Sequence, residues 1–466
     1  MFGSSRKTGR GIEKQTADGE AIAAALRPVT RSRAEGARKP ASTFPRFQSN
    51  ASDEMDSRAT DKLSTARLKL RKTFTPAQPM GDRSLFAGRR DLLGTVIRGI
   101  EDTRVHTIIY GQRGIGKTSL LHVVADAARE ARYLVAYVSC GATASFDETF
   151  RAIASEIPLR FHASYGPKAP EAEAGGVFGQ LLPAEPISPR LASEICAKVS
   201  GTRVLVIVDE FDRCGSLEFR RDIAEFLKNL SDRSVRVQLV IAGVAENFDD
   251  LLESGVLVQR NVIALEVSRM SADEARDLLR VGQEFSGVEF EENAVDLLVA
   301  AANGLPYIIS LLAQHAGLAA LTQGKMSVSR VDVMTAVDSA LAEMKGRIPR
   351  RSWAQLSRVI NEGADALLGP LAAVARAENG RFTSEDIKTA SMGPLDMARA
   401  QALVDRLARE GVLVMRESED AGGQYRFLDQ NVLPYLWLKA VRGAFTERAE
   451  GRGAQREAAD KGATAV

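Results

Sequence analysis

The segment Gly111–Thr118, which reads GQRGIGKT, restricts the fold of this chain more than any other feature. It fits the pattern G-x-x-x-x-G-K-[ST] with no mismatch. Small residues let the backbone curl so that successive N–H groups face a phosphate chain, and the helix that follows adds its positive dipole end. We therefore predict a nucleotide site in which Lys117 bridges the β- and γ-phosphates and the Thr118 hydroxyl is a ligand of Mg²⁺. The residues expected around the phosphates are Gly111, Gln112, Arg113, Gly114, Ile115, Gly116, Lys117, Thr118 and Ser119.

Short apolar runs alternate with helical patterns over residues 84–268. The runs expected to be strands are Val105–Tyr110, Tyr133–Ser139, Val204–Val208, Val235–Ala242 and Val262–Val267. The helical patterns between them are Lys117–Ala131, Phe146–Ile157, Leu191–Val199 and Leu217–Leu230. Largely apolar strands that alternate with helices are typical of a parallel sheet covered on both faces. The sequence therefore predicts an α/β core with a five-stranded parallel sheet, interrupted by a long loop or insertion at 161–189.

Two adjacent carboxylates follow the apolar run Val204–Val208. A buried strand that ends in Asp209 and Glu210 is costly unless a metal or a water molecule uses them. Beside a phosphate-binding loop, Asp209 would hold the Mg²⁺ shell, and Glu210 would orient and deprotonate the attacking water. Asp212 is expected to be a surface or capping residue rather than a catalytic one.

The remainder of the chain divides into three parts. Residues 269–344 show helical patterns without strands and are predicted to form a helical lid, after which 345–351 (KGRIPRR) is predicted to be a linker. Residues 353–446 show helices and then two strand-like pieces, Gly411–Arg416 and Tyr425–Leu428, which is the order of a winged helix-turn-helix. Residues 447–466 are polar and are expected to be disordered.

On these residues the chain resembles AAA+-type P-loop ATPases, in the branch that includes origin-recognition initiators and STAND signalling ATPases. The resemblance extends from about Ser84 to Phe445, through the Gly111–Thr118 loop, the Val204–Glu210 strand, the lid and the winged-helix order. It implies ATP and Mg²⁺ as cofactors and the hydrolysis of ATP, with Lys117 and Glu210 in the catalytic roles given above.

Three further positions match the family pattern, each with a plainer alternative. Phe86 lies in the segment Leu85–Arg90, which resembles the stretch that covers the adenine, but the segment also fits a simple lead into a helix. Arg260 precedes the fifth strand, where related proteins often place an arginine finger that reaches a neighbouring subunit's γ-phosphate; an ordinary surface arginine is the alternative. Pro306 ends a Gly304-Leu305-Pro306 element that resembles the lid contact with the nucleotide, or it merely starts a helix.

Two departures from the family pattern weaken the prediction of fast hydrolysis. Many lids of this type carry a sensor arginine where this chain reads Pro306-Tyr307. The fourth strand is expected to end at Ala242-Gly243 without a polar sensor residue, and Asn247 is a weak substitute. We therefore expect nucleotide binding with slow, partner-stimulated turnover.

Charge is distributed unevenly along the chain. Residues 1–80 contain 16 Lys and Arg against 8 Asp and Glu, although the net charge of the whole chain is only +2. This basic stretch is predicted to be a mostly disordered leader with a short helix near Lys62–Lys72, and it could also attract nucleic acid or another anionic surface.

The partner is less well determined than the nucleotide. In the predicted winged helix, Arg399 and Arg406 fall on one face of Asp396–Glu410 and could contact duplex DNA, together with the basic linker 345–351. However, residues 353–446 hold 11 Lys and Arg against 12 Asp and Glu, and DNA-binding domains usually show a basic surplus. A nucleotide-dependent DNA-associated switch is therefore weighed against a STAND-like regulator whose winged helix contacts protein or its own core. Self-association is a further expectation.

The composition points to a cytoplasmic protein. No run approaches the roughly 20 apolar residues of a membrane helix, and the polar residues 1–20 do not resemble a secretory signal. The three cysteines are widely spaced, which argues against a disulfide framework and fits a reducing compartment.

Overall fold

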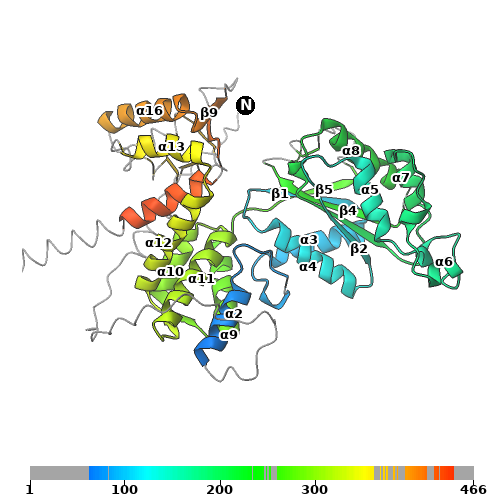
Figure 1. The fold of residues 1–466 in the computed structure, drawn as a ribbon, viewed down its shortest axis with the longest axis horizontal. Helices are drawn as coiled ribbons and strands as arrows, with labels where there is room; N and C mark the ends of the chain where they lie inside the picture. The colour runs from blue at the N-terminus through cyan, green and yellow to red at the C-terminus, as the bar shows by residue number, and fades with distance from the viewer. Residues whose placement is uncertain are drawn as a thin grey trace, which may run out of the picture. The chain divides into compact units, whose positions relative to one another are not determined.

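A computed structural model shows the fold of the chain (Figure 1). The residues that it describes are 62–444, except 82, 234, 246–247, 249–250, 253–259, 362–367, 369–370, 373, 376–380, 384–385, 387–393, 417–423 and 430. They form two compact units, each described below by itself. We call Pro76–Leu278 with Leu305–Tyr307 the P-loop unit. The remaining described residues make up the helical unit, which ends within the segment Ile308–Val466.

The P-loop unit is built on a five-stranded sheet with the order β2-β3-β4-β1-β5. All neighbouring strands in it are parallel. The strands are β1 (His106–Gly111), β2 (Leu134–Ser139), β3 (Val204–Asp209), β4 (Val237–Val244) and β5 (Val262–Glu266). The predicted parallel α/β core is confirmed. Strands β2, β3 and β4 pair in chain order, whereas β1 lies between β4 and β5.

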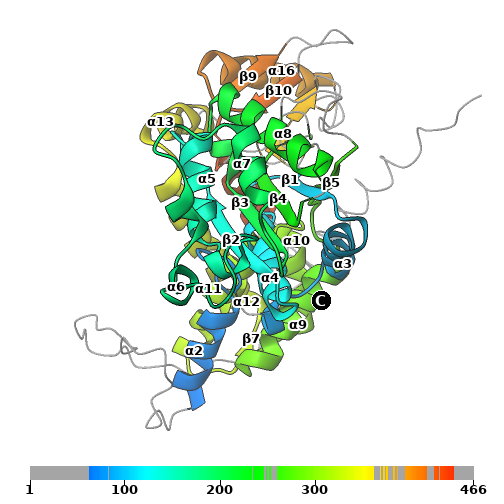
Figure 2. The ribbon, with the colours of Figure 1, turned by 90° about the vertical axis from the view of Figure 1, so that its right-hand side faces the viewer.

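Helices cover both faces of this sheet (Figures 1 and 2). One face carries α3 (Arg90–Arg98) and α4 (Lys117–Glu130), and the other carries α5 (Phe146–Ser155), α7 (Pro189–Cys196) and α8 (Leu217–Asp232). All six residues of β3 are buried, which explains why this strand reads as an unbroken apolar run. Because β1 and β3 both run parallel to β4, which lies between them, their carboxyl ends lie at the same edge of the sheet.

The expected loop at 161–189 is more ordered than predicted. It contains η4 (Phe178–Leu181) and the short helix α6 (Pro170–Glu173), and η3 (Leu159–Phe161) leads into it. Phe178 is only 1% exposed and lies against the His162 ring, with a centroid distance of 5.0 Å. The prediction missed this packing because one buried aromatic residue anchors a stretch that has no helical or strand period.

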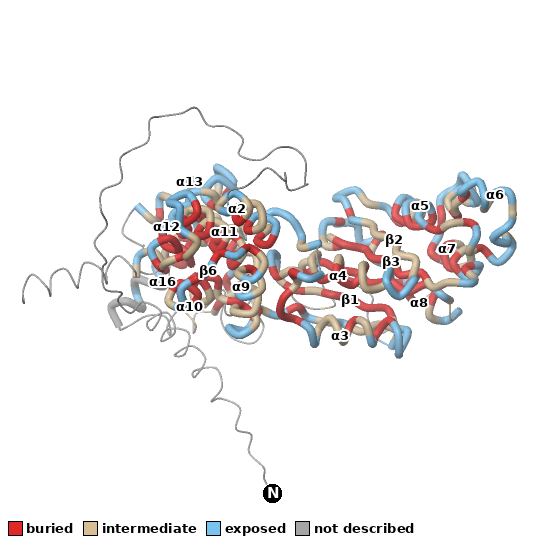
Figure 3. Tube along the Cα trace, turned by 90° about the horizontal axis from the view of Figure 1, so that it is seen from below, coloured by how far each residue is buried: buried red, intermediate tan, exposed pale blue. Residues whose placement is uncertain are grey.

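The helical unit contains most of the predicted lid. Its helices here are α10 (Glu292–Ala302), α11 (Pro306–Thr322) and α12 (Arg330–Arg347), and α9 (Ala272–Ser286) enters it from the P-loop unit. Helix α11 is apolar on nearly all sides and is buried along its length (Figure 3). The expectation that strands stop after Ser271 is wrong, because β6 (Glu289–Phe290) and β7 (Ser327–Val328) form a short parallel pair.

The C-terminal part of this unit has helices followed by a hairpin, as expected. It comprises α13 (Arg350–Val359), β8 (Arg381–Thr383), α16 (Pro394–Arg409), β9 (Leu413–Arg416), β10 (Gln424–Phe427) and a helix at 432–444. The three strands form an antiparallel sheet in the order β8-β10-β9, and β8 was not predicted. The predicted linker 345–351 is largely helical, because α12 continues to Arg347 and α13 begins at Arg350.

The short helix predicted near Lys62–Lys72 is present as α2 (Lys62–Thr73). It is docked on the helical unit and buries Ala66 and Leu70. Residues 1–61 and 445–466 lie outside the described part of the chain, so the expectations for them stay predictions. Among the described residues, no helix is long and apolar enough to cross a membrane.

Candidate functional site

The loop after β1 has the curled backbone that its sequence predicts. Gly111, Gly114 and Gly116 have φ values of 145°, 75° and 95°, in the region that favours glycine. A Cβ atom at Gly111 would lie 2.7 Å from the carbonyl oxygen of Val267, which leaves no room for a side chain. Helix α4 begins directly after this curl, at Lys117, so its unpaired N–H groups and its positive dipole end face the loop.

Lys117 is held inside the loop. This residue is only 8% exposed. Its Nζ donates hydrogen bonds to the carbonyl oxygens of Gly111 at 2.8 Å and Gln112 at 2.9 Å. Burial lowers the pKa of Lys117 to about 8, against the opposing effect of the carboxylates of Asp212 and Asp209. The ammonium group therefore makes its hydrogen bonds with carbonyl oxygens of the loop. A phosphate oxygen, which is charged and so a stronger acceptor, could replace them.

Asp209 ends β3 and is 4% exposed. Its Oδ2 accepts a hydrogen bond from the Tyr137 hydroxyl at 2.8 Å, and its Oδ1 accepts one from the Glu210 backbone N–H at 2.8 Å. Burial and the neighbouring Asp209 charge raise the pKa of Tyr137, so the phenol stays a proton donor. Both carboxylate oxygens thus have a fixed orientation and retain further lone pairs for a metal-bound water.

Glu210 lies immediately outside the sheet in a left-handed conformation, with φ of 54°. Its Oε2 accepts hydrogen bonds from the Ser139 hydroxyl at 2.9 Å and from Nη1 of Arg213 at 2.6 Å. Partial burial favours a higher pKa, but the hydrogen bonds from Arg213 and Ser139 outweigh it, so the pKa of Glu210 is lowered. A lowered pKa keeps this carboxylate ionised, and it also makes it a weaker proton acceptor than an ordinary glutamate.

Asp212 has the capping role expected of it. Its Oδ1 accepts a hydrogen bond from the backbone N–H of Val244 at 2.7 Å, at the carboxyl end of β4. The carboxyl end of β4 therefore lies beside the acidic side chain of Asp212. The strand itself does not end in a polar residue of the kind that serves as a sensor in related proteins. Asn247, the proposed substitute, lies outside the described residues.

Of the other residues predicted to bind the nucleotide, those at the start of α11 lie closest to the Gly111–Thr118 loop. Pro306 and Tyr307 approach it closely, because Cβ atoms built on Gly116 and Gly114 would lie 3.8 Å from Pro306 Cγ and 3.3 Å from Tyr307 Cβ. Thr118 and Phe86 are half-buried, and Ser119 Oγ accepts a hydrogen bond from the Met80 N–H at 3.1 Å.

Arg260 lies at the other end of the sheet. It is exposed and just precedes β5, whose first residue, Val262, pairs with His106 at the start of β1. In a parallel pair this is the amino end, whereas the Gly111–Thr118 loop follows the carboxyl end of β1. Arg260 therefore cannot serve the loop of its own chain, and a finger role would require a second subunit.

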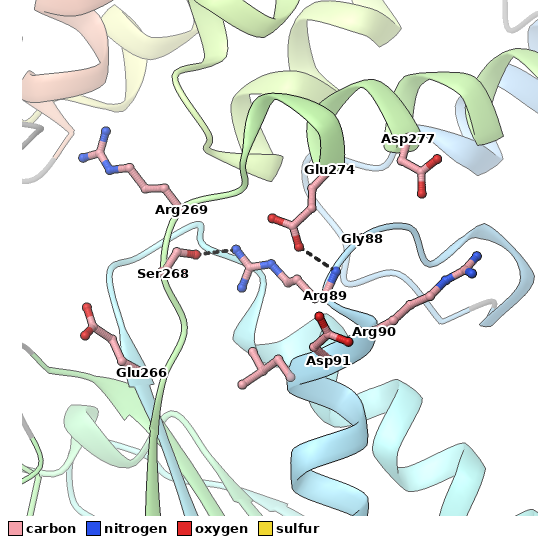
Figure 4. A pocket seen from close by; sticks show the side chains of 10 residues that line it. Gly88, Arg89, Arg90, Asp91, Glu266, Ser268, Arg269, Glu274 and Asp277 are labelled. Atoms are coloured by element: carbon pink, nitrogen blue, oxygen red, sulfur yellow. Dashed lines mark hydrogen bonds between the residues drawn. The ribbon is translucent and has the colours of Figure 1, made fainter. Parts of the chain in front are cut away.

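A cavity of about 490 Å³ lies beside the predicted adenine-covering segment (Figure 4). Arg89, 8% exposed, crosses its wall, donating its backbone N–H to Glu274 Oε1 at 2.8 Å and its Nη2 to the Ser268 carbonyl oxygen at 2.7 Å. Burial lowers the pKa of Arg89 to about 10 despite the nearby Glu274 charge. No residue of Gly111–Ser119 lines this cavity, so it is distinct from the phosphate-binding loop.

The sequence missed Tyr137, Ser139 and Arg213. Tyr137 and Ser139 are on β2, and Ser139 pairs with Asp209 in the β2–β3 register. The signal that could have found them is the polar end of the strand Tyr133–Ser139, because the carboxyl ends of adjacent parallel strands lie together. Within the described part of the chain, no three His, Cys, Asp or Glu side chains form a group that could hold a metal ion.

Comparison with known proteins gives one family. The family model described as "Novel STAND NTPase 1" matches residues 76–434. A search of curated proteins finds no significant match. Among solved structures, Aeropyrum pernix Orc1 in complex with DNA is 16% identical, with a TM-score of 0.43 over 81% of this chain and 98% of that one. Cdc6p from Pyrobaculum aerophilum is 14% identical (TM-score 0.41; 81% and 98%), and the Thermotoga maritima RuvB Holliday junction branch migration motor is 15% identical (TM-score 0.37; 75% and 95%).

Proposed function

The chain belongs to the novel STAND NTPase 1 family, and on that premise we propose that it is a slow, Mg²⁺-dependent ATP hydrolase that acts as a molecular switch. The observation that carries this proposal is the meeting of three groups at one edge of the sheet. These are the curled loop Gly111–Thr118, the buried Lys117 ammonium and the oriented carboxylates of Asp209 and Glu210.

The residues present fit a magnesium–nucleotide complex. When bound, Mg²⁺ would neutralise charge on the β- and γ-phosphates. Thr118 and the buried Asp209 would hold its shell, and Asp209 is already oriented by two hydrogen bonds that leave lone pairs available. The loop N–H groups would bind phosphate oxygens, while Lys117 would exchange its two carbonyl acceptors for them.

Glu210 would act as the base that takes a proton from the attacking water. Its Oε2 already accepts hydrogen bonds from the Ser139 hydroxyl and from Arg213 Nη1, which make the carboxylate a weaker base. This weakened basicity, together with the absence of a polar residue at the end of β4, supports slow turnover that a partner accelerates. Pro306 and Tyr307, which approach the loop, are the groups expected to sense the nucleotide.

We further propose that the partner is duplex DNA and that residues 350–444 form a winged helix. Helix α16 would be the recognition helix, since Leu403, Val404 and Leu407 are buried and so leave its opposite side for contact. Arg406 is a candidate contact there, with Arg399, whose side chain lies outside the described residues. The exposed Arg350 and Arg351 of the basic segment 345–351 would add charge.

A STAND-like regulator that binds protein is the second candidate. It is favoured by the charge of residues 353–446, where 11 Lys and Arg stand against 12 Asp and Glu. Such a balance gives little counterion release and therefore weak attraction to DNA.

Two measurements test the proposal. Isothermal titration of the purified chain with ATP and Mg²⁺ should show binding that Lys117→Ala removes; the absence of ATP uptake by the unaltered chain would overturn the nucleotide role. ATPase rates with and without duplex DNA then separate the two candidates. Stimulation supports the DNA-associated switch, and an unchanged rate without measurable DNA binding supports the protein-binding regulator.

A further inference from the structure

Helix α2 is a strongly basic element that precedes the part of the chain matched by the family model. It carries five basic residues and no acidic one, while the match begins at residue 76. The basic residues are Lys62, Arg67, Lys69, Arg71 and Lys72. Most of the charge excess of residues 1–80 therefore resides in one twelve-residue helix.

This helix is a fixed part of the helical unit. Leu70 and Phe74 are fully buried, and the Phe74 carbonyl oxygen accepts a hydrogen bond from Gln314 Nε2 at 2.5 Å. It lies beside α9 and α11, where glycines make room for it (Figure 3). A Cβ atom would lie 2.1 Å from Phe74 Cζ if built on Gly282, and 2.5 Å from Leu70 Cδ2 if built on Gly317.

Glycine inside a helix costs about 1 kcal/mol relative to alanine. Two such glycines at the contact with α2 indicate that these helices are adapted to it. The helix therefore presents its cations from a defined position rather than from a solvated leader.

On α9, which packs against α2, Glu284 pairs with Arg280 at 2.7 Å. Lys69 Nζ and Lys72 Nζ each lie 5.8 Å from the centre of the Phe285 ring.

Within the described part of the chain, Lys62 and Arg71 have no ion-pair partner. Lys62, Arg71 and Lys72 are also exposed, so α2 presents accessible positive charge at both of its ends.

We propose that these exposed cations of α2 bind the phosphate backbone of duplex DNA. A twelve-residue helix is about 18 Å long, which lets its cations meet several phosphates. An anionic membrane fits less well, because Leu70 and Phe74, which would have to enter the lipid, are buried in the protein. The inference extends the DNA association proposed above, and it supplies the basic surplus that residues 353–446 lack.

The test compares three variants of the full chain by fluorescence anisotropy with a labelled duplex of arbitrary sequence. In the first, Lys62→Gln, Arg71→Gln and Lys72→Gln remove the exposed cations of α2. In the second, matched variant, Arg132→Gln, Lys168→Gln and Lys198→Gln remove three exposed cations of the P-loop unit. The third conserves charge through Lys62→Arg, Arg71→Lys and Lys72→Arg.

At about 50 mM salt, the first variant should bind at least about tenfold more weakly. The slope of a plot of log K against log salt concentration, where K is the association constant for the duplex, should become less steep. The change should be about 0.9 for each phosphate that α2 no longer neutralises. The second and third variants should bind like the unaltered chain. ATP affinity and thermal unfolding should be unchanged in all three, which shows that folding and the nucleotide site are intact.

Other results would overturn the proposal. If the first variant binds duplex as tightly as the matched variant does, α2 does not contact the DNA. If Arg406→Gln alone abolishes binding while the α2 variant retains it, the DNA role stands without α2. Should the unaltered chain bind no duplex, or bind only phosphatidylserine vesicles, α2 is not a DNA surface, and the ATP measurements decide the nucleotide role separately.

Discussion

The Tyr137 hydroxyl on β2 donates a hydrogen bond to Asp209 Oδ2 on β3 over a distance of 2.8 Å. The Tyr137 ring also lies against His122 of α4, with a centroid distance of 5.2 Å. Because α4 begins at the phosphate-binding loop, this contact links the loop helix to the acidic strand end. Tyr137 is therefore a positioning residue for the carboxylate that we expect to hold the Mg²⁺ shell.

Replacing Tyr137 by Phe should weaken the dependence of nucleotide binding on Mg²⁺. The ring and its packing remain, but a hydrogen bond to a charged acceptor is removed, which typically costs about 1.5–3 kcal/mol. We expect a roughly tenfold or larger increase in the Mg²⁺ concentration at half-maximal binding of a fluorescent ATP analogue. Tyr165→Phe is the control, and an equal Mg²⁺ requirement in both variants would contradict this role.

The affinity for ATP should fall as the pH rises through about 8. Burial lowers the pKa of Lys117 to about 8, so the unliganded side chain loses its positive charge above this pH. Binding of the anionic phosphates then requires uptake of a proton, which weakens the apparent affinity. Titration calorimetry from pH 7 to pH 9 in buffers of different ionisation enthalpy measures both effects. Binding independent of pH, with no proton uptake, would contradict the assignment.

The same pKa shift has a consequence for stability. Between about pH 8 and the ordinary lysine value of 10.5, the unfolded chain binds more protons at Lys117 than the folded chain does. The Lys117 contribution to the free energy of unfolding should therefore rise with pH in this range. Urea denaturation of the unaltered chain and of Lys117→Met should show this rise in the difference between their pH profiles. Parallel profiles would argue against a buried, titrating Lys117.

Replacing Glu210 by Gln should slow hydrolysis and leave ATP binding intact. The amide keeps the size of the side chain but cannot accept the proton from water, and such a loss typically costs about 10²–10⁴ in rate. Single-turnover hydrolysis and ATP affinity should be measured together, with Glu194→Gln as a surface control. Equal rates in the unaltered chain and Glu210→Gln would refute the role of base.

Replacing Gly282 by Ala should destabilise the helical unit. The new methyl group would lie 2.1 Å from Phe74 Cζ, and overpacking of this kind costs about 1–3 kcal/mol. Gly346→Ala is a matched control in α12, because its Cβ meets nothing within 4 Å and alanine favours a helix. Urea unfolding should therefore show opposite changes in the two variants. A neutral Gly282→Ala would mean that α2 is not packed as described.

Local patterns sufficed for much of the P-loop unit. The five apolar runs, the curl at Gly111–Thr118 and the carboxylates Asp209 and Glu210 were all readable, because strand burial and phosphate binding depend on residues close in sequence. The helices of the expected lid were found for the same reason. Roles in catalysis and the identity of the partner stay predictions.

Tertiary structure alone decided which distant residues meet. Tyr137 and Ser139 reach Asp209 and Glu210 only because β2 pairs with β3, some 70 residues later in the chain. Helix α2 was expected from the sequence, but its docking was not. It docks because glycines far along the chain leave space for Leu70 and Phe74. Periodicity and composition indicate whether each segment prefers to be a helix, a strand or a loop. Contacts between distant segments depend on how their surfaces fit together, and no single segment contains that information.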